Sequence, residues 1–152
     1  MQTFLPYPSF QETAQTLDWR RLGKQRVEGY QIITMLTTAN YTGHWRNHPA
    51  VLMWRGYEDA LKLYVNTMIE EWKRRGYLNT LRLYELDEDS LVLPWWLGDP
   101  RLHDSHKSNL LRKDFAYYSA FGWDLPPDLP YFWPVTMASL SPRVESENDP
   151  TL

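Results

Sequence analysis

The feature that most limits the fold of this chain is an apolar repeat in its middle third. Its members stand three or four positions apart: Val51, Trp54, Tyr57, Leu61, Val65, Met68 and Trp72. Residues at this spacing share one face of an α-helix. The preceding pair His48-Pro49 is typical of a helix start. A single helix to Arg75 fits the pattern, although Gly56 is a point at which it can break.

Two more long helices are expected, one on each side of this repeat. The first runs from about Asp18 to Leu36, with a buried stripe formed by Leu22, Gly29, Ile33 and Leu36. The other runs from near Pro100 to Lys113 and has available for its polar sides His103, His106, Lys107, Asn109 and Arg112. No segment shows the alternation of a half-buried strand. The predicted class is all-α, a compact single-domain bundle of about three main helices with irregular aromatic- and proline-rich connections.

Three local signals concern the ends and the packing of these helices. Ser9 followed by Glu12 has the spacing of a capping box. Gly23 and Gly29 in the first long helix favour close packing of another element over room for a ligand. The basic run 73–75 before Gly76 suits the negative end of a helix dipole, and we prefer this interpretation to DNA contact.

The length and composition predict a single soluble domain. We assign residues 1–135 to that domain and residues 136–152 to a polar, flexible tail. The chain has no cysteine, which excludes disulfides and thiolate chemistry. No apolar run approaches the roughly 18 residues that span a membrane, and the N-terminus lacks the features of a signal peptide. We therefore expect a cytoplasmic monomer with no membrane partner.

Charge is distributed unevenly along the chain. The formal net charge is −3, which argues at first against a nucleic-acid binder. Up to Arg82, however, eleven cations face seven anions, and the acidic excess lies in residues 85–89 and after Asp124. A locally basic surface can bind phosphates on a chain that is acidic as a whole. Charge alone gives this prediction only weak support.

The densest group of charges lies in residues 17–28. Arg21, Lys24 and Glu28 stand at i, i+3 and i+7, so a helix places them on one face. A basic face with one carboxylate suits an enzyme that acts on a polyanion. The alternative is a solvated helix with one i, i+4 ion pair, worth a few tenths of a kcal/mol.

The histidines have spacings that can hold zinc. His103 and His106 stand three apart on a predicted helix, and His44 and His48 stand four apart across a loop. The sequence has no HExxH motif and no clear third ligand, and it lacks a glycine-rich phosphate loop and a GxSxG motif. We predict no metal and no cofactor.

Several motifs occur in a distinctive order. Leu17-Asp18, Leu22 and Arg26-Val27-Glu28 come first, Asn47-His48-Pro49 and the run 70–77 follow, and Ser108 to Asp114 precedes Tyr117-Tyr118. In this order, over roughly residues 1–120, they resemble the phage endonuclease V, or pyrimidine-dimer DNA glycosylase, family. The start Met-Gln-Thr-Phe-Leu-Pro and the run Arg-Leu-Gly-Lys-Gln-Arg are similar to small bacterial members.

The resemblance implies a compact all-α fold that binds duplex DNA and flips a nucleotide out of the helix. It implies excision of a damaged or modified base, by default from a pyrimidine dimer, through an amine nucleophile, and strand cleavage by β-elimination through a Schiff base. Glu28 matches the catalytic glutamate, which can stabilise an oxocarbenium-like centre and move protons. Arg26 is one position away from the family's arginine because Val27 intervenes, and Arg21 falls where the family often has His or Gly.

The nucleophile is the main departure from the family. Characterised phage enzymes use the α-amine of a small residue exposed by removal of Met, whereas Gln2 is bulky enough to hinder that removal. The candidates are the α-amine of retained Met1, that of Gln2 after processing, and Lys24. An α-amine loses its proton more readily than a lysine, so we rank it first. Glycosylase action without lyase activity is a fourth possibility.

Double-stranded DNA is the expected partner. Arg21, Lys24, Arg26 and Arg46 are predicted to hold phosphates near Glu28, and further contacts are predicted for Asn47, His48, His106, Lys107, Asn109, Arg112 and Lys113. Two other hypotheses remain open. The same basic face can bind nucleic acid without chemistry, or the chain can be a helical scaffold whose charges are only surface.

Overall fold

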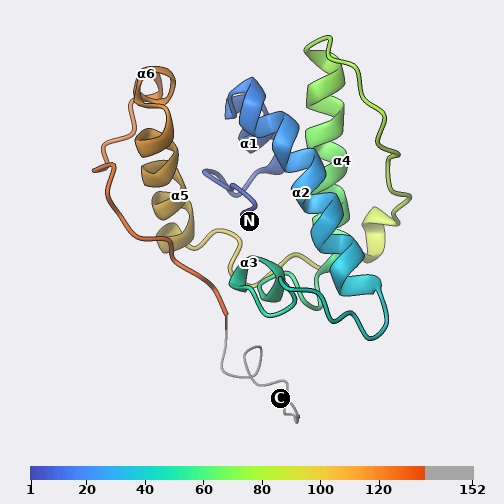
Figure 1. Cartoon of the computed structure of the whole chain (residues 1–152). Helices are drawn as coiled ribbons and strands as arrows, with labels where there is room; N and C mark the ends of the chain where they lie inside the picture. Colours follow the sequence, from blue (N-terminus) through green and yellow to red (C-terminus); the bar gives the residue numbers. More distant parts are fainter. Residues whose placement is uncertain (136–152) are drawn as a thin grey trace.

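The computed structural model describes residues 1–135, which contain helices and no β-strand (Figure 1). Its long helices are α2 (Trp19–Thr37), α4 (Glu58–Arg74) and α5 (Pro100–Lys113). The shorter elements are α1 (Phe10–Thr16), α3 (Pro49–Leu52), η1 (Glu88–Ser90), α6 (Phe115–Tyr118) and η2 (Ser119–Phe121). The all-α class and the three main helices are therefore confirmed. The tail predicted at 136–152 lies outside the described residues.

Helices α2 and α4 pack closely because α2 presents glycine where α4 presents large side chains. A Cβ atom on Gly23 would lie 2.8 Å from the ring of Trp72, and one on Gly29 would lie 2.5 Å from Cγ2 of Val65. Both distances are shorter than carbon atoms tolerate. The interpretation of these glycines as packing residues is confirmed.

The apolar repeat forms two helices instead of one. Helix α3 ends at Leu52, Gly56 adopts φ +87°, and α4 begins at Glu58. A positive φ is the left-handed conformation that glycine adopts at little cost, and it interrupts a right-handed helix. The prediction of a single helix to Arg75 is therefore wrong. The break between the two helices includes Gly56, the residue at which the sequence allowed one.

The C-terminal end of α4 closes on Gly76, as the sequence predicts. Gly76 has φ +92° and its N–H donates to the carbonyl of Lys73, while the N–H of Tyr77 donates to the carbonyl of Trp72. The Tyr77 ring stacks on Trp72 at a centroid distance of 4.3 Å. These two hydrogen bonds and the apolar contact form a Schellman motif. They orient the Tyr77 side chain beside the start of α2.

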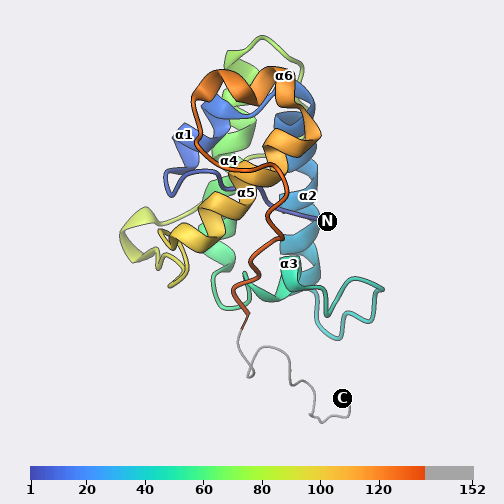
Figure 2. The ribbon, with the colours of Figure 1, turned by 90° about the vertical axis from the view of Figure 1, so that its left-hand side faces the viewer.

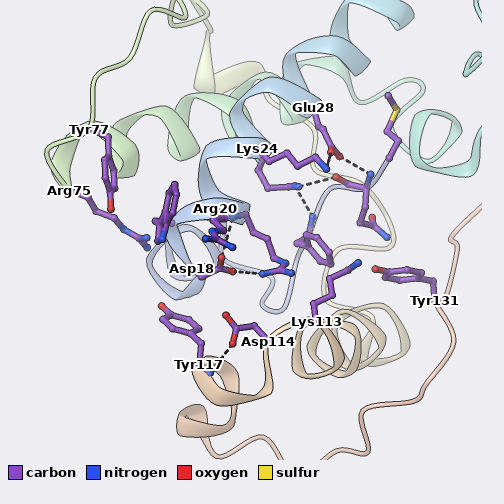
Figure 3. A pocket seen from close by; sticks show the side chains of 16 residues that line it. Asp18, Arg20, Lys24, Glu28, Arg75, Tyr77, Lys113, Asp114, Tyr117 and Tyr131 are labelled. Atoms are coloured by element: carbon purple, nitrogen blue, oxygen red, sulfur yellow. Dashed lines mark hydrogen bonds and ion pairs between the residues drawn. The ribbon is translucent and has the colours of Figure 1, made fainter.

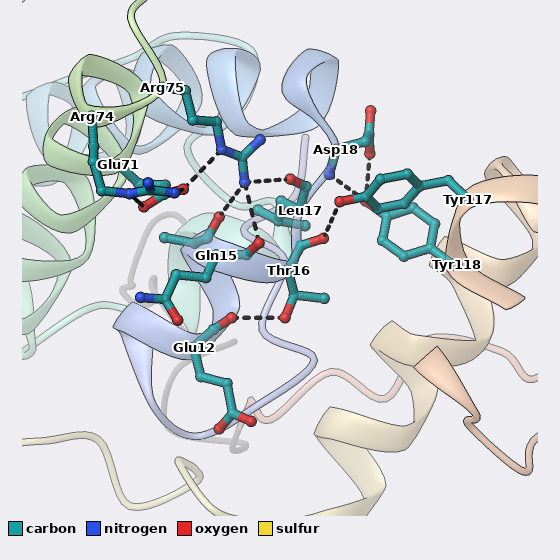
Figure 4. A network of polar contacts seen from close by, with 11 residues as sticks. Glu12, Gln15, Thr16, Leu17, Asp18, Glu71, Arg74, Arg75, Tyr117 and Tyr118 are labelled. Carbon is teal, nitrogen blue, oxygen red and sulfur yellow. Dashed lines mark hydrogen bonds and ion pairs between the residues drawn. The ribbon is translucent and has the colours of Figure 1, made fainter. Parts of the chain in front are cut away.

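The basic residues at this end of α4 tie it to α1 (Figure 4). Arg75 donates to the buried carboxylate of Glu71 and to the main-chain carbonyls of Ala14, Gln15 and Leu17. Arg74 donates two hydrogen bonds to the same carboxylate, and these contacts hold the pKa of Glu71 below its ordinary value. Arg75 thus satisfies carbonyl groups that the end of α1 leaves open.

An extended N-terminal segment, residues 2–5, runs between α2 and α5 (Figures 1 and 2). Its polar main-chain groups are bound by buried side chains instead of by a neighbouring strand. Gln25 of α2 accepts from the N–H of Phe4 and donates to the carbonyl of Gln2. On the other side, His106 accepts from the N–H of Leu5 and His103 donates to its carbonyl. The segment is therefore a hydrogen-bonded joint between α2 and α5.

Helix α5 is covered along one side by the proline-rich segment 126–132. Ser108 donates to the carbonyl of Pro126, Asn109 donates to that of Leu129, and Ser105 accepts from the N–H of Phe132. The placement of His103, His106 and Asn109 on exposed polar sides is therefore wrong. All three are buried because they bind main-chain groups of segments that lie against the helix.

Candidate functional site

A cavity of about 890 Å³ lies at the beginning of α2, beside the N-terminal segment (Figure 3). The start of α2 supplies much of its wall, and the end of α4 and the α5–α6 junction supply the rest. The lining residues are Met1, Gln2, Phe4, Asp18, Trp19, Arg20, Arg21, Lys24, Gln25, Glu28, Arg75, Tyr77, Lys113, Asp114, Tyr117 and Tyr131.

Cations outnumber free carboxylates around this cavity. Five basic side chains line it: Arg20, Arg21, Lys24, Arg75 and Lys113. Three acidic side chains also line it, and several of these charges are already paired. Asp18 binds Arg21 and the Tyr118 hydroxyl, Glu28 pairs with Lys24, and Arg75 pairs with Glu71 outside the cavity. The walls therefore favour an anionic ligand such as a nucleic-acid backbone.

Glu28 lies in this basic cavity and is held from two sides. Its Oε1 accepts a hydrogen bond from the main-chain N–H of Gln2 at 2.9 Å, and its Oε2 lies 3.6 Å from Nζ of Lys24. The carboxylate is largely buried, with 14% of the side chain exposed, whereas the Lys24 side chain is 73% exposed. The beginning of the chain and the candidate catalytic carboxylate are thus in direct contact.

Buried side chains keep residue 2 at this position. The amide of Gln25 binds the carbonyl of Gln2 and the N–H of Phe4, and the Tyr64 hydroxyl lies 2.7 Å from both Oε1 of Gln25 and the Phe4 carbonyl, to which its single proton can be donated. Trp54 adds a hydrogen bond to the hydroxyl of Thr3. A nitrogen held by so many contacts loses little conformational freedom on meeting a substrate, which favours reaction.

The structure brings together six of the residues predicted for the site. These are Met1, Gln2, Arg21, Lys24, Glu28 and Lys113, and all of them line the cavity. Arg21 and Glu28 lie on one side of α2 as their spacing predicts, and Lys113 reaches the cavity from the end of α5. Two long helices that are distant in sequence therefore contribute to one basic wall.

Arg26 faces away from this cavity, which corrects its placement beside Glu28. Its guanidinium lies over the ring of Trp72, 4.4 Å from the centroid, and donates to Oδ1 of Asn79. Burial lowers the pKa of Arg26. Two positions along a helix turn a side chain by about 200°, so Arg26 and Lys24 point to different sides.

Arg46, Asn47 and His48 also lie apart from Glu28. Arg46 and Asn47 line a separate hollow near the C-terminal end of α2, together with Arg55 and Glu58. The ring of His48 accepts from the N–H of Ala50 and caps α3. Arg46 therefore does not line the cavity that contains Glu28, and the DNA contacts predicted for Arg46, Asn47 and His48 stay predictions.

The polar residues of α5 divide into buried and exposed groups. His106 and Asn109 are fully buried, so a duplex cannot reach them in this fold. Lys107 lies over the ring of Tyr7, and Arg112 donates to the carbonyl of Pro127. Neither lines the cavity. Of the α5 residues predicted to contact DNA, Lys113 is the one that lines the cavity.

Several lining residues were not among the predicted site residues. Tyr77, Tyr117 and Tyr131 are aromatic residues that enter the cavity from three separate segments, and Asp114 caps α6 beside them. Tyr77 and Tyr117 belong to the motifs of the family resemblance, but no site role was assigned to them, because aromatic residues are common throughout this chain. Arg20 belongs to the basic run 20–26 but did not share the predicted face.

Within residues 1–135, no group of three or more His, Cys, Asp or Glu side chains is arranged to hold a metal ion. Over the same residues, no helix is both long enough and apolar enough to cross a membrane. His103 and His106 bind main-chain groups of the N-terminal segment and of residue 98 instead of pairing at a metal.

The helical fold brings a carboxylate, the start of the chain and a basic cavity together, an arrangement that suits a protein acting on nucleic acid. The family model for pyrimidine dimer DNA glycosylase matches residues 1–85, more than half of the chain. The chain therefore belongs to this family and is a DNA glycosylase with DNA as its substrate. The matched region contains Met1, Gln2 and Glu28. Neither the curated proteins nor the solved structures contain a match to the chain.

Proposed function

We propose that this protein excises a base from a pyrimidine dimer by attack of its N-terminal amine on C1′ of the nucleotide, with Glu28 as the catalytic carboxylate. The single observation that carries the proposal is the hydrogen bond between the nitrogen of residue 2 and Oε1 of Glu28, at 2.9 Å. It places the beginning of the chain against a carboxylate within a basic cavity. A nucleophile and a proton-transfer group need this proximity.

In the proposed reaction, the amine forms a bond to C1′ as the bond between C1′ and the base nitrogen breaks. The electron pair of the broken bond leaves with the base. Glu28 stabilises the positive charge that develops on the sugar. Opening of the sugar ring gives a Schiff base, and removal of a proton from C2′ then eliminates the 3′ phosphate. Glu28 is positioned to move that proton.

The amine belongs to the N-terminus in preference to Lys24. If Met1 is removed, the nitrogen that binds Glu28 becomes the free α-amine. If Met1 is retained, its α-amine is one residue away, and Met1 also lines the cavity. Lys24 is the ion-pair partner of Glu28 at 3.6 Å, and a free α-amine in general loses its proton more readily than a lysine side chain does.

Basic residues around the cavity support binding of the phosphates that flank the flipped nucleotide. Arg21 and Lys24 are one helical turn apart on α2, and both line the cavity together with Lys113 from the end of α5. Figure 3 shows Lys24 and Lys113 on the two sides of the cavity. Arg20 adds a further charge at the N-terminal end of α2. Such contacts fix the position of a strand without reading its sequence.

The test is reduction with borohydride in the presence of a duplex with one abasic site. An amine that attacks C1′ gives a covalent complex, and peptide mass spectrometry then places the adduct on Met1, Gln2 or Lys24. Intact mass shows whether Met1 is present. We expect an adduct on the first residue of the mature chain. No adduct, with DNA binding intact, would contradict amine attack and leave a glycosylase without lyase activity or a binding module.

Glu28→Gln tests the carboxylate in the same assay. We expect loss of base release by about 10²-fold or more, with DNA affinity retained. Glu70→Gln is the matched control, because Glu70 also pairs with a lysine on a helix but is exposed and away from the cavity. Equal losses of activity, affinity and thermal stability in Glu28→Gln would assign Glu28 a structural role.

A further inference from the structure

The Gln2 side chain is buried in the cavity wall with one end of its amide unused. Its Oε1 accepts from the N–H of Thr3 at 2.9 Å, which identifies the oxygen end of the group. Only 7% of the residue is exposed, and Nε2 has no hydrogen-bond partner among the described residues. The two N–H bonds of Nε2 are therefore donors without acceptors.

Buried donors without acceptors are rare in folded proteins, because each has lost its hydrogen bonds to water. Tyr131 lines the same cavity, and its hydroxyl faces the Gln2 amide closely enough to affect its own pKa. The distance and angle nevertheless do not satisfy Nε2. Nε2 is shielded from water in the free protein, so a ligand oxygen in the cavity satisfies it once the neighbouring Tyr131 side chain moves aside.

The main-chain nitrogen of Gln2 indicates which part of the substrate would supply that oxygen. This nitrogen is hydrogen-bonded to Glu28, the proposed catalytic carboxylate. The Gln2 amide is only a few bonds away, so it is adjacent to the centre where C1′ reacts. In a pyrimidine nucleotide the nearest carbonyl to C1′ is the one at C2, which is bonded to the glycosidic nitrogen. Dimerisation through C5 and C6 leaves this carbonyl in place.

We infer that the side-chain amide of Gln2 donates a hydrogen bond to the C2 oxygen of the leaving pyrimidine. The inference rests on the proposed function and adds a group that recognises and stabilises the leaving base. As the bond from C1′ to N1 breaks, its electron pair spreads over N1 and the C2 oxygen. A donor already placed at that oxygen stabilises the charge without reorganisation.

The proton balance is complete without a further reactant. The attacking amine loses a proton when its bond to C1′ forms, and the departing base takes up one proton at nitrogen. Gln2 keeps both of its amide protons and acts through the hydrogen bond alone. Residue 2 is a large glutamine in this chain, whereas the phage enzymes have a small residue there. The inference gives this larger side chain a chemical role.

Gln2→Met and Gln2→Glu test the inference. Both substitutions preserve approximate size, so both should leave the processing of Met1 as it is in the native chain, and intact mass checks this. The first removes the donors, and the second places a negative carboxylate against the C2 oxygen. The two probes are a duplex with one pyrimidine dimer and the same duplex with one abasic site, which carries no base to recognise.

We expect the ratio of base release to abasic-site trapping to fall by about 10²-fold in Gln2→Met. The fall should be larger in Gln2→Glu because the carboxylate repels the developing charge. Gln31→Met, at an exposed position of α2, is the matched control and should keep the native ratio. Thermal melting of each variant accompanies the rates.

Three results would overturn the inference. An unchanged ratio shows that the amide does not act on the base. Equal losses on both probes show that Gln2 acts only through the position of the N-terminus or through the fold. If the native protein neither releases a base nor forms a trapped complex with abasic DNA, the proposed function itself is wrong.

Discussion

The half of the molecule formed by α2 and α4 and the half formed by α5 and α6 are held by different forces. Helices α2 and α4 interlock through apolar contacts at Gly23 and Gly29. Helix α5 is joined to α2 through the main chain of residues 2–5, which His103 and His106 bind from one side and Gln25 from the other. Leucines of α5 also belong to the apolar core, so the hydrogen-bonded joint is an additional contact that the pair α2 and α4 does not have at its glycines.

The cavity lies where these two halves meet. Packing requires only a good fit of volumes, whereas hydrogen bonds to a main chain fix its position and direction. The joint therefore places the nitrogen of residue 2 against Glu28 more strictly than apolar contact could. The polar half of the fold contributes to stability and also defines the site.

The largest effect is expected at the joint itself. Gln25→Leu removes the partners of the Gln2 carbonyl and the Phe4 N–H, and it leaves these buried groups unsatisfied. We expect a loss of about 3–5 kcal/mol in the free energy of unfolding, measured by urea denaturation. Base release should fall by more than the smaller fraction of folded protein accounts for, because residue 2 is no longer held against Glu28.

Gln31→Leu is the control for this change, since Gln31 is exposed on the same helix. We expect a change within about 0.5 kcal/mol for the control. If Gln25→Leu were equally mild, the joint would contribute little, and the contrast between the two halves would fail.

Acid should weaken the joint before it weakens the apolar half. Burial lowers the pKa of His103 and lowers that of His106 to about 3, so both rings are neutral in the folded chain at pH 7. Below about pH 6.5 the unfolded chain binds more protons than the folded one, and stability falls as the pH falls. For His106 alone the loss is about 2 kcal/mol between pH 6.5 and 5.

Denaturation at a series of pH values measures this slope. His106→Gln should reduce the slope below pH 6.5, although the variant is less stable at every pH. His44→Gln, at an exposed histidine, should keep the native slope. Parallel slopes in all three proteins would show that His106 does not govern the response to acid.

A smaller effect is expected where α2 and α4 interlock. Gly29→Ala places a methyl group 2.5 Å from Val65, and a buried β-branched side chain has little freedom to move away. Overpacking costs about 1–3 kcal/mol, and the better helix propensity of alanine returns up to about 1 kcal/mol. We expect a net loss of about 1–2 kcal/mol in unfolding free energy.

Gln31→Ala serves as the control for Gly29→Ala. Its side chain is exposed, so alanine should leave stability nearly unchanged or raise it slightly. A stabilising Gly29→Ala would mean that the helices separate easily, and the apolar half would then be less tightly packed than the contacts indicate.

The smallest effect concerns DNA affinity and the wall that α5 contributes. Lys113→Gln should weaken DNA binding by a few-fold and reduce the slope of log affinity against log salt by about one. Lys73→Gln is the control, because Lys73 pairs with Glu70 and does not line the cavity. Equal slopes in the two variants would show that the α5 wall does not contact the DNA backbone.

How well each half can be predicted from the sequence depends on the same difference between apolar packing and hydrogen bonds to a main chain. The periods of α2, α4 and α5 were visible in the sequence because apolar residues recur at helical spacing. The face with Arg21, Lys24 and Glu28 followed from the same geometry. Gly56 lies in the break between α3 and α4, and Gly76 ends α4, both at the positive φ that glycine adopts easily. Local rules were sufficient wherever a residue's partner lay on its own helix.

The errors occurred where the partner lay far away in the sequence, either in a main chain or, for Arg26, in a ring on α4. His106 and Asn109 are polar residues on a helix, and periodicity alone places such residues in solvent. Nothing local shows that an extended segment or a proline-rich segment covers them. Arg26 was misplaced because its partner, the ring of Trp72, was itself assigned only to a core. Such contacts depend on the path of the whole chain.

The buried N-terminal segment also bears on the order in which the protein is made. The N–H of Leu5 meets its partner His106 across 101 positions, so the first residues to leave the ribosome must wait for almost the last helix. Contacts between such distant residues form late, because a long loop must close first. The side of the joint that faces α5 therefore forms only after His103 and His106 have been made. The contacts of residue 2 with Glu28 and Gln25 span only 26 and 23 positions and can form earlier.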